Sequence, residues 1–405
     1  WGCKMIAPKL RFSEFKDEWF EKKLEEIATV ERGKFSPRPR NDPKFYNGEM
    51  PFIQTGDVAN CGIYLEKYTQ TLNEEGIKVS KVFPKNSILI TIAANIGDTA
   101  ITRFPVACPD SLVAIQPLEN IANTHFLNNL LELKKEYLDS QATQNAQKNI
   151  NLQVLKPLEL VIPNYQEQTK IAEFLSAVDD KISQLSRQLE LLNQYKKGVM
   201  QKIFSQEIRF KNENGEDFGE WEEVPLNFVC DVRDGTHDSP KYVKKGYPLV
   251  TSKNLKDGKL DLTDISLISQ TDFDNINKRS KVHTGDIIFG MIGTIGNPVL
   301  LKESNFAIKN VALIKEKDEL LNKFLIHFLN SSLFDRQVKV LNVGNTQKFL
   351  SLNQIRNLSV PKPTIQEQEK IAEFLTAIDE RIDHTTTQLN HTKQWKKGLL
   401  QQMFV

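Results

Sequence analysis

The residues that come nearest to known catalytic motifs each lack a part that the chemistry requires. Pro109-Asp110 followed by Glu132-Leu133-Lys134 has the spacing of a metal-dependent nuclease, but Glu132 lies in a segment of helical period, not on the strand that such a site needs. Asn297-Pro298-Val299 lacks the second proline and the aromatic residue with which amino-methyltransferases clamp a flipped base. No Gly-x4-Gly-Lys-Ser/Thr phosphate loop occurs. The sequence therefore predicts a chain without a catalytic site, a nucleotide site or a bound cofactor.

The histidines and cysteines are too scattered to predict a metal site. The six histidines form no His-Glu-x-x-His pair, and His384 and His391 are expected to face solvent on a helix. The cysteines form no Cys-x-x-Cys pair; they are Cys3, Cys61, Cys108 and Cys230. Such isolated thiols suit a reducing cytoplasm, and they predict neither zinc nor disulfides.

Two basic segments that also contain aromatic residues have the composition of DNA-contacting loops. Residues 31–46 carry five basic and two acidic side chains, and residues 233–259 carry seven and three. Arg and Lys neutralise phosphates, whereas polar side chains reach base edges in a groove. The candidate DNA contacts are Lys34, Arg38, Arg40, Lys44 and Tyr46 in the first segment and Thr236, His237, Lys241, Tyr242, Lys253 and Asn254 in the second. For either segment alone, a solvated loop without a ligand is the alternative.

These two segments lie in a chain that contains a long internal repeat. Residues 166–204 recur as residues 366–404 at an offset of 200 without gaps, and about half of the positions are identical. The register continues upstream, where Gln147-Lys148 matches Gln347-Lys348. Farther upstream the similarity is weak, as between Leu10-Arg11-Phe12 and Ile208-Arg209-Phe210. The chain is thus a variable unit and a near-constant segment, each present twice.

The near-constant segments are predicted to be long helices, because their apolar residues alternate in steps of four and three. The apolar seams are Ile171, Leu175, Val178, Ile182, Leu185 and Leu189, and Ile371, Leu375, Ile378, Ile382 and Leu389. Lys196 interrupts the first seam, and Thr385 and Thr392 are polar members of the second. Two near-identical seams in one chain favour an internal antiparallel coiled coil over the alternative, a homodimer zipper.

The variable units have the pattern of mixed α/β (α+β) domains. Short β-rich runs at residues 87–93, 113–116, 286–291 and 311–315 precede helical stretches at residues 124–138 and 320–334. We expect two globular domains joined by two long helices with a pseudo-two-fold repeat. The expected boundaries are 5–165 and 205–365 for the domains, counted from Met5, and 166–204 and 366–405 for the helices.

The net charge of the chain is only +1, so any DNA contact must come from local basic patches. With 40% hydrophobic and 26% charged residues, the composition is that of a globular protein, and no apolar stretch approaches the ~20 residues that span a bilayer.

The domain layout and several short sequence motifs together resemble the specificity (S) subunits of type I restriction-modification systems. The resemblance covers essentially the whole chain, and its phrases include Asp234-Gly-Thr-His-Asp-Ser-Pro, Pro248-Leu-Val-Thr-Ser-Lys-Asn-Leu, Pro51-Phe-Ile-Gln-Thr-Gly-Asp, Gly293-Thr-Ile-Gly-Asn and the repeated Gln-Glu-Gln-x-Lys-Ile-Ala-Glu-Phe-Leu.

The resemblance implies a non-catalytic subunit in which each variable unit, a target recognition domain, reads one half of a bipartite, asymmetric double-stranded DNA site. It further implies that the coiled coil sets the half-site spacing and docks two methyltransferase subunits, which carry S-adenosylmethionine. Two restriction/translocase subunits that use ATP and Mg complete the enzyme. The alternatives are a stand-alone bivalent DNA-binding regulator and a purely architectural coiled-coil protein.

Overall fold

A computed structural model describes residues 7–142, 149–293, 295–341 and 349–405 of the chain. Met5, Cys3 and the Gln147-Lys148 and Gln347-Lys348 pairs lie outside the described residues. The chain divides into two compact units, which we call unit 1 (residues 1–187 and 386–405) and unit 2 (residues 188–385). The division cuts both long helices near their middles, so each unit contains one half of each helix.

The two long helices are α7 (Tyr165–Phe204) and α13 (Ile365–Met403), and both begin one residue before the expected segments. Both have an N-terminal cap: Asn164 Oδ1 accepts from the Glu167 backbone N–H at 2.9 Å, and Thr364 Oγ1 accepts from that of Glu367 at 3.4 Å. The amphipathic seams explain why such long helices form, since neither helix buries its apolar stripe alone.

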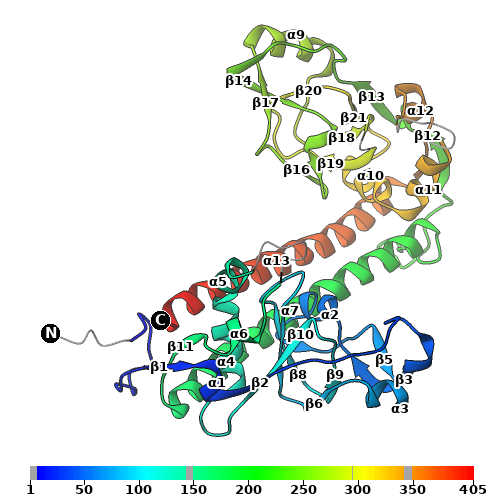
Figure 1. The fold of residues 1–405 in the computed structure, drawn as a ribbon. Helices are drawn as coiled ribbons and strands as arrows, with labels where there is room; N and C mark the ends of the chain where they lie inside the picture. Colours follow the sequence, from blue (N-terminus) through cyan, green and yellow to red (C-terminus); the bar gives the residue numbers. More distant parts are fainter. Residues whose placement is uncertain (1–6, 143–148, 294, 342–348) are drawn as a thin grey trace. The chain divides into compact units, whose positions relative to one another are not determined.

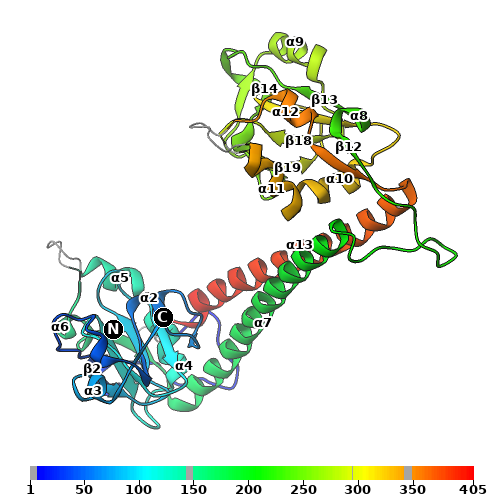
Figure 2. The ribbon, with the colours of Figure 1, turned by 90° about the vertical axis from the view of Figure 1, so that its right-hand side faces the viewer.

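Within each unit, the N-terminal half of one long helix packs against the C-terminal half of the other (Figures 1 and 2). In unit 1, Ile171, Leu175 and Val178 share a core with Leu399 and Met403. In unit 2 the same core positions are filled by Ile371, Leu375 and Ile378 of α13 with Met200 and Ile203 of α7. The helices therefore run in opposite directions, and their seam side chains are used inside the chain.

Lys196, which interrupts the first apolar seam, forms an ion pair inside unit 2. Its Nζ lies 2.5 Å from Asp379 Oδ1, and in unit 1 Lys396 Nζ lies 2.9 Å from Asp179 Oδ1. The two pairs are equivalent, because each residue of one pair is 200 positions from its counterpart in the other. The unit 1 pair is the more buried, with side chains 10% and 13% exposed against 39% and 20% in unit 2. Burial raises the pKa of Asp179, and the opposing Lys396 lowers it.

Unit 1 is built on two mixed sheets and a short strand pair. The five-stranded sheet has the order β2 (Ala28–Arg32), β10 (Leu112–Pro117), β7 (Ile88–Thr91), β8 (Thr99–Thr102), β4 (Tyr64–Leu65). The four-stranded sheet has the order β5 (Gln70–Leu72), β3 (Tyr46–Phe52), β9 (Val106–Ala107), β6 (Val82–Phe83), and β1 (Phe20–Lys23) pairs with β11 (Glu159–Ile162). The helices are α1 (Leu24–Ile27), α2 (Thr55–Ala59), α3 (Glu74–Lys78), α4 (Thr124–Leu133), α5 (Lys135–Ser140) and α6 (Leu152–Leu155), with a 3₁₀ turn at Pro43–Phe45.

Unit 2 repeats this plan with differences in the smaller sheet. Its larger sheet has the order β13 (Cys230–Asp234), β21 (Val311–Glu316), β18 (Ile287–Gly290), β19 (Gly296–Leu300). The smaller sheet is β17 (Ser266–Ile268), β14 (Tyr242–Val250), β20 (Ala307–Ile308), and the strand pairs are β15 (Leu255–Lys256) with β16 (Lys259–Leu260) and β12 (Glu222–Pro225) with β22 (Ser359–Lys362). The helices are α8 (Leu226–Val229), α9 (Gln270–Ser280), α10 (Asn322–Leu329), α11 (Ser332–Leu341) and α12 (Leu352–Arg356), with a 3₁₀ turn at Ser252–Asn254.

The predicted strands occur at the expected places, but each predicted helical stretch is two helices. All four residues of β7 and of β18 are buried, which explains their unbroken apolar sequences. The stretch 124–138 breaks at Lys134, whose backbone (φ −85°, ψ 0°) ends α4, and the stretch 320–334 breaks at Asn330-Ser331. Ser331 Oγ then accepts from the Phe334 backbone N–H and starts α11. Helical periodicity alone does not reveal such a turn, because the apolar face continues across it.

A buried glutamate in the first turn of each long helix fastens the segment that opens each unit. Its carboxylate, which is fully buried, accepts two hydrogen bonds from an arginine and one from a tryptophan indole, at distances of 2.7–3.3 Å. The residues are Arg11, Trp19 and Glu167 in unit 1 and Arg209, Trp221 and Glu367 in unit 2. The weak sequence similarity upstream of the repeat, at Arg11 and Arg209, therefore reflects the same anchoring contact in both units.

Removing one partner of the buried ion pair should destabilise unit 1 more than the equivalent change destabilises unit 2. We expect Asp179→Ala to cost about 3 kcal/mol, since the largely buried Lys396 loses its nearer carboxylate and keeps only the contact with Glu132 at 3.6 Å among the described pairs. We expect Asp379→Ala to cost about 1 kcal/mol, since that pair is more exposed. The double variant Asp179→Leu/Lys396→Met should recover most of the loss. Guanidinium denaturation followed by circular dichroism measures all three; equal losses for the two single variants would contradict this ranking.

His327 should make unit 2 less stable in mild acid. Burial lowers the pKa of His327 to about 4, whereas an unfolded histidine titrates near 6.5. The unfolded chain thus binds a proton that the folded chain rejects, so stability falls as the pH decreases from about 6.5 to 4. Unit 1 has Asn129 at the equivalent helical position, and His327→Asn should flatten the pH dependence in this window. Thermal unfolding of both proteins at several pH values measures it, and parallel curves would contradict the assignment.

Candidate nucleic-acid interface

In both units the candidate DNA loop leaves the larger sheet at a glycine that has no room for a side chain. Gly33 follows β2 and Gly235 follows β13, and their backbone N–H groups donate to Leu112 and Val311 of the neighbouring strand at 2.9 Å. A Cβ at Gly33 would lie 2.3 Å from the Pro109 carbonyl oxygen, and one at Gly235 would lie 2.4 Å from that of Ile308. The start of each loop is therefore fixed by close backbone contact.

The loop of unit 1 is anchored by aromatic side chains and leaves its cations at the surface. Phe35 is buried and packs with Phe45, Tyr46 and Phe52. The Tyr46 hydroxyl donates to the Arg40 carbonyl, and Arg40 Nη2 bonds Asp110 Oδ1 at 2.8 Å.

The candidate cations Lys34, Arg38, Arg40 and Lys44 are all exposed. Three of them are held in place: Arg40 pairs with Asp110, Arg38 donates to the Pro37 carbonyl at 2.8 Å, and Lys44 lies over the Phe45 ring. A fixed backbone with surface cations is what phosphate contact requires.

The loop of unit 2 is held by a buried carboxylate instead of an aromatic cluster. Asp234, whose side chain is 7% exposed, accepts from His237 Nε2 at 2.9 Å and pairs with Arg279 of α9. His237 Nδ1 lies 2.9 Å from Asn310 Oδ1, and Thr236 Oγ1 accepts from the Asp238 backbone N–H. The His237 side chain is 53% exposed, so its ring is both fixed and accessible.

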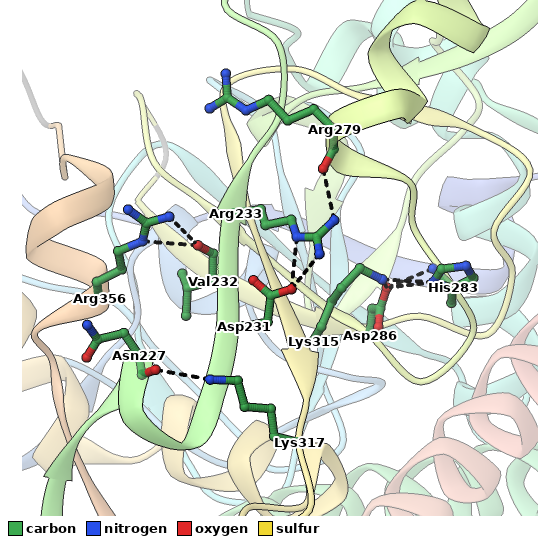
Figure 3. A network of polar contacts seen from close by, with 10 residues as sticks. All are labelled: Asn227, Asp231, Val232, Arg233, Arg279, His283, Asp286, Lys315, Lys317 and Arg356. Carbon is green, nitrogen blue, oxygen red and sulfur yellow. Dashed lines mark hydrogen bonds and ion pairs between the residues drawn. The ribbon is translucent and has the colours of Figure 1, made fainter.

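A network of polar contacts behind this loop occupies Arg233, which the sequence counts among the basic residues of the segment. Figure 3 shows its guanidinium pointing at Asp231, 2.6 Å away, and at the Arg279 carbonyl, 3.1 Å away. In the same view Lys315 bonds Asp286 at 2.6 Å and His283 at 2.8 Å. Arg233 and Lys315 therefore form contacts within unit 2, and the surface lysines of the loop remain available to a ligand.

Three of the remaining candidates lie at the surface and one does not. Lys241, Tyr242 and Lys253 are exposed. Asn254 is 2% exposed: its Nδ2 donates to the carbonyls of Asp261 and Asp264, and its Oδ1 accepts from Thr251. Its amide closes the loop and is not available to a base, which corrects the expectation for this residue. The spacing Thr251-Ser-Lys-Asn254 is that of an N-terminal capping box. In this loop the pattern therefore indicates a cap and not a contact with a base.

The structure adds Arg279, Asn310 and Lys309 to this surface. Arg279 lies in the last turn of α9, and Lys309 Nζ bonds Ser239 Oγ at 2.7 Å. These residues lie 45 to 73 positions from the loop residues that they contact, and no local pattern marks them.

The residues of the rejected nuclease pattern do not meet. Asp110 pairs with Arg40, whereas Glu132 lies in α4, 3.6 Å from Lys396 Nζ. Among the described residues no three His, Cys, Asp or Glu side chains gather as a metal site would require. The described cysteines are unpaired, and burial raises the pKa of the Cys61 thiol to about 11 and those of Cys108 and Cys230 to about 12. These thiols remain protonated and unreactive near neutral pH.

Comparison with known proteins identifies the family. The model of the type I restriction modification DNA specificity domain matches residues 16–194 and again residues 219–394. The chain belongs to this family. It is 25% identical over 367 residues to the type I restriction enzyme MjaVIII specificity subunit of Methanocaldococcus jannaschii, which covers 87% of this chain and 84% of that protein. It is 22% identical over 411 residues to the Escherichia coli EcoBI specificity subunit, covering 93% and 84%.

Solved structures support the same fold. The S subunit of a type I restriction-modification system from M. genitalium superposes with a TM-score of 0.68 at 17% identity, covering 99% of both chains. The match of the family model confirms the predicted family, whose specificity subunits are non-catalytic recognition subunits. The superposition confirms the two-domain α/β architecture with an internal repeat. No helix in the described ranges combines the length and the hydrophobicity that crossing a bilayer requires.

A methyl group at Gly33 or Gly235 should displace the loop that follows. We expect Gly33→Ala and Gly235→Ala each to reduce DNA affinity by at least about tenfold, because the loop must shift to relieve a contact below 3 Å. Gly198, in α7, has open space around its Cβ position, so Gly198→Ala is the matched control and should stabilise the helix by up to about 1 kcal/mol. Fluorescence anisotropy with duplex DNA measures the affinity; unchanged binding of both loop variants would show that these loops do not contact DNA.

Proposed function

We propose that this chain is the sequence-reading subunit of a type I restriction-modification enzyme, and that unit 1 and unit 2 each read one part of a bipartite, asymmetric double-stranded DNA site. The observation that carries the proposal is the pairing of one repeated scaffold with two chemically different basic loops. Equivalent scaffolds give two binding heads, and different loops give two different half-sites. The recognition domains are assigned to residues 5–165 and 205–365, and the long helices between them to the conserved, partner-docking part.

The DNA contacts are assigned to exposed and half-buried members of each loop. In unit 1 these are Lys34, Arg38, Arg40, Lys44 and Tyr46. In unit 2 they are Thr236, His237, Lys241, Tyr242 and Lys253, together with Lys309. With a net charge of only +1, these local patches and not the whole chain supply the attraction to phosphates.

The catalytic work belongs to partner subunits in the cytoplasm. Two methyltransferase subunits that carry S-adenosylmethionine dock on the outer faces of the long helices, because the inner seams are occupied within the chain from Ile171 to Ile182 and from Ile371 to Ile382. Two restriction subunits that use ATP and Mg complete the enzyme. A stand-alone bivalent regulator is not favoured, since the match to the specificity family extends through most of both repeats.

Co-expression with the cognate methyltransferase subunit should produce one methylated, bipartite motif in the host genome. The chain alone should neither methylate nor cleave DNA. Mapping of methylated bases by long-read sequencing measures the first outcome, and assays of the purified, partner-free chain measure the second. A single uninterrupted motif, or enzymatic turnover by the chain alone, would overturn the proposal.

A further inference from the structure

A pocket of about 360 Å³ lies beside the basic loop of unit 1. It is lined by the end of that loop, by the antiparallel pair of β3 and β5, and by the two residues that precede β5. The side chains that give it its chemistry are Asn41, Tyr46, Asn47, Tyr68, Thr69 and Gln70. None of the residues that line it carries a formal charge, although the exposed cations Arg40 and Lys44 are the sequence neighbours of its lining residues Asn41 and Pro43. Amides, hydroxyls and aromatic rings inside a basic frame are the groups that recognise a base edge.

Asn47 lies in a bulge of β3, where the strand pairs with β5. Tyr46 and Met50 both pair with Leu72 of β5, so residues 47–49 are looped out of the strand. Asn47 has a φ of +66°, a conformation that asparagine tolerates better than most residues. A Cβ at Gly48 would lie 2.3 Å from Asn73 Cα, so the bulge is pressed against the neighbouring strand. Bulges of this kind re-aim side chains beside functional sites.

Unit 2 keeps the bulge and changes its side chains. Tyr242 and Tyr247 of β14 both pair with Ile268 of β17, which loops out residues 243–246. The looped-out sequence is Val-Lys-Lys-Gly in unit 2 and Asn-Gly-Glu in unit 1. A shared backbone device with divergent side chains is expected where two domains of one scaffold read different sequences.

Gln70 is another of the three amides at the pocket, and its side chain is already oriented. Its Oε1 accepts from Gln54 Nε2 at 3.2 Å, and in β5 it lies opposite Phe52 of β3. Its Nε2 is left to donate and Oε1 keeps a second lone pair. A glutamine that offers one donor and one acceptor side by side pairs with the N6 and N7 atoms of adenine.

Tyr46 connects this pocket to the phosphate-contacting cations. Its hydroxyl bonds the Arg40 carbonyl, and its ring packs 6.1 Å from that of Phe52. Arg40, a proposed phosphate contact whose guanidinium pairs with Asp110, is thus joined through its backbone to a residue that lines the pocket.

We propose that Gln70 and Asn47 are specificity-determining residues of unit 1, and that Gln70 reads one adenine of its half-site. The inference rests on the proposed function and adds to it the residues that read the sequence, as distinct from those that hold phosphates.

The test is a change of base preference. Gln70→Glu removes the donor and keeps two acceptors, and a carboxylate accepts from the N4 amino group of cytosine. The wild-type chain and the variant are each co-expressed with the methyltransferase subunit, and methylated motifs are mapped. We expect one position of one half-site to change from adenine to cytosine while the other half-site stays the same.

A second variant and two controls make the result decisive. Asn47→Gly suits the positive φ and should relax one position of the same half-site. In binding assays with the assembled complex, both variants should lose roughly 10- to 100-fold in preference for the wild-type site, without a change in the slope of log K against log salt. Arg38→Ala/Arg40→Ala should lower that slope and leave the motif unchanged. Gln153→Glu, an exposed amide on α6, should change neither.

The outcomes separate the two proposals. A wild-type complex that yields no bipartite motif contradicts the proposed function. A wild-type motif that persists in both Gln70→Glu and Asn47→Gly, with unchanged site preference, contradicts this inference alone. Loss of methylation by a soluble variant supports the inference only if its binding has fallen to the level of non-specific DNA with the salt slope retained. If specific binding is retained, the inference is overturned.

Discussion

The pairing of Asp179 with Lys396 and of Asp379 with Lys196 constrains the whole chain to one helix orientation. Each long helix contributes one aspartate and one lysine to these two pairs, and the repeat places them at matching positions. If the helices ran parallel in the register of the repeat, aspartate would face aspartate and lysine would face lysine. Only the antiparallel arrangement puts unlike charges together, so two polar positions within apolar seams exclude the alternative pairing. Each unit depends on that choice, because its core is completed by half of the other helix.

On the shared scaffold, the two units hold their basic loops by different contacts. Both fix the start of a basic loop with a glycine pressed against the neighbouring strand. Unit 1 then holds its loop by packing Phe35 into an aromatic cluster, whereas unit 2 uses the buried carboxylate of Asp234. An apolar anchor leaves the arginine side chains of unit 1 at the surface, where Arg40 pairs with Asp110, while the carboxylate of unit 2 holds His237 and Arg279 in defined positions. Two units with the same scaffold can therefore differ in the side chains that their loops expose while the fold of the scaffold remains the same.

The features that could be predicted from the sequence are those written in local pattern or in repetition. The seams predict both long helices to within two residues at either end, since an apolar stripe at helical spacing has few other solutions. The exposed cations of both loops also followed from composition.

Lys196 could be seen only as an interruption, because its partner Asp379 lies 183 positions away. Asn254 was misassigned, since a buried turn amide and a base-reading amide are the same residue type. The contributions of Arg279 and Asn310 depend on tertiary placement, and no periodicity encodes it.

The division of the chain has a consequence for its synthesis. Unit 2 is one continuous stretch, residues 188–385, whereas unit 1 needs residues 386–405 to cover the apolar face of α7 at Ile171, Leu175 and Val178. On the ribosome the second unit is thus complete before the first. At about 5–20 residues per second, roughly 10–40 seconds separate the emergence of that face from the arrival of Leu399 and Met403. A message that ends early leaves the first-made domain, not the last, with an exposed core for chaperones and proteases to find.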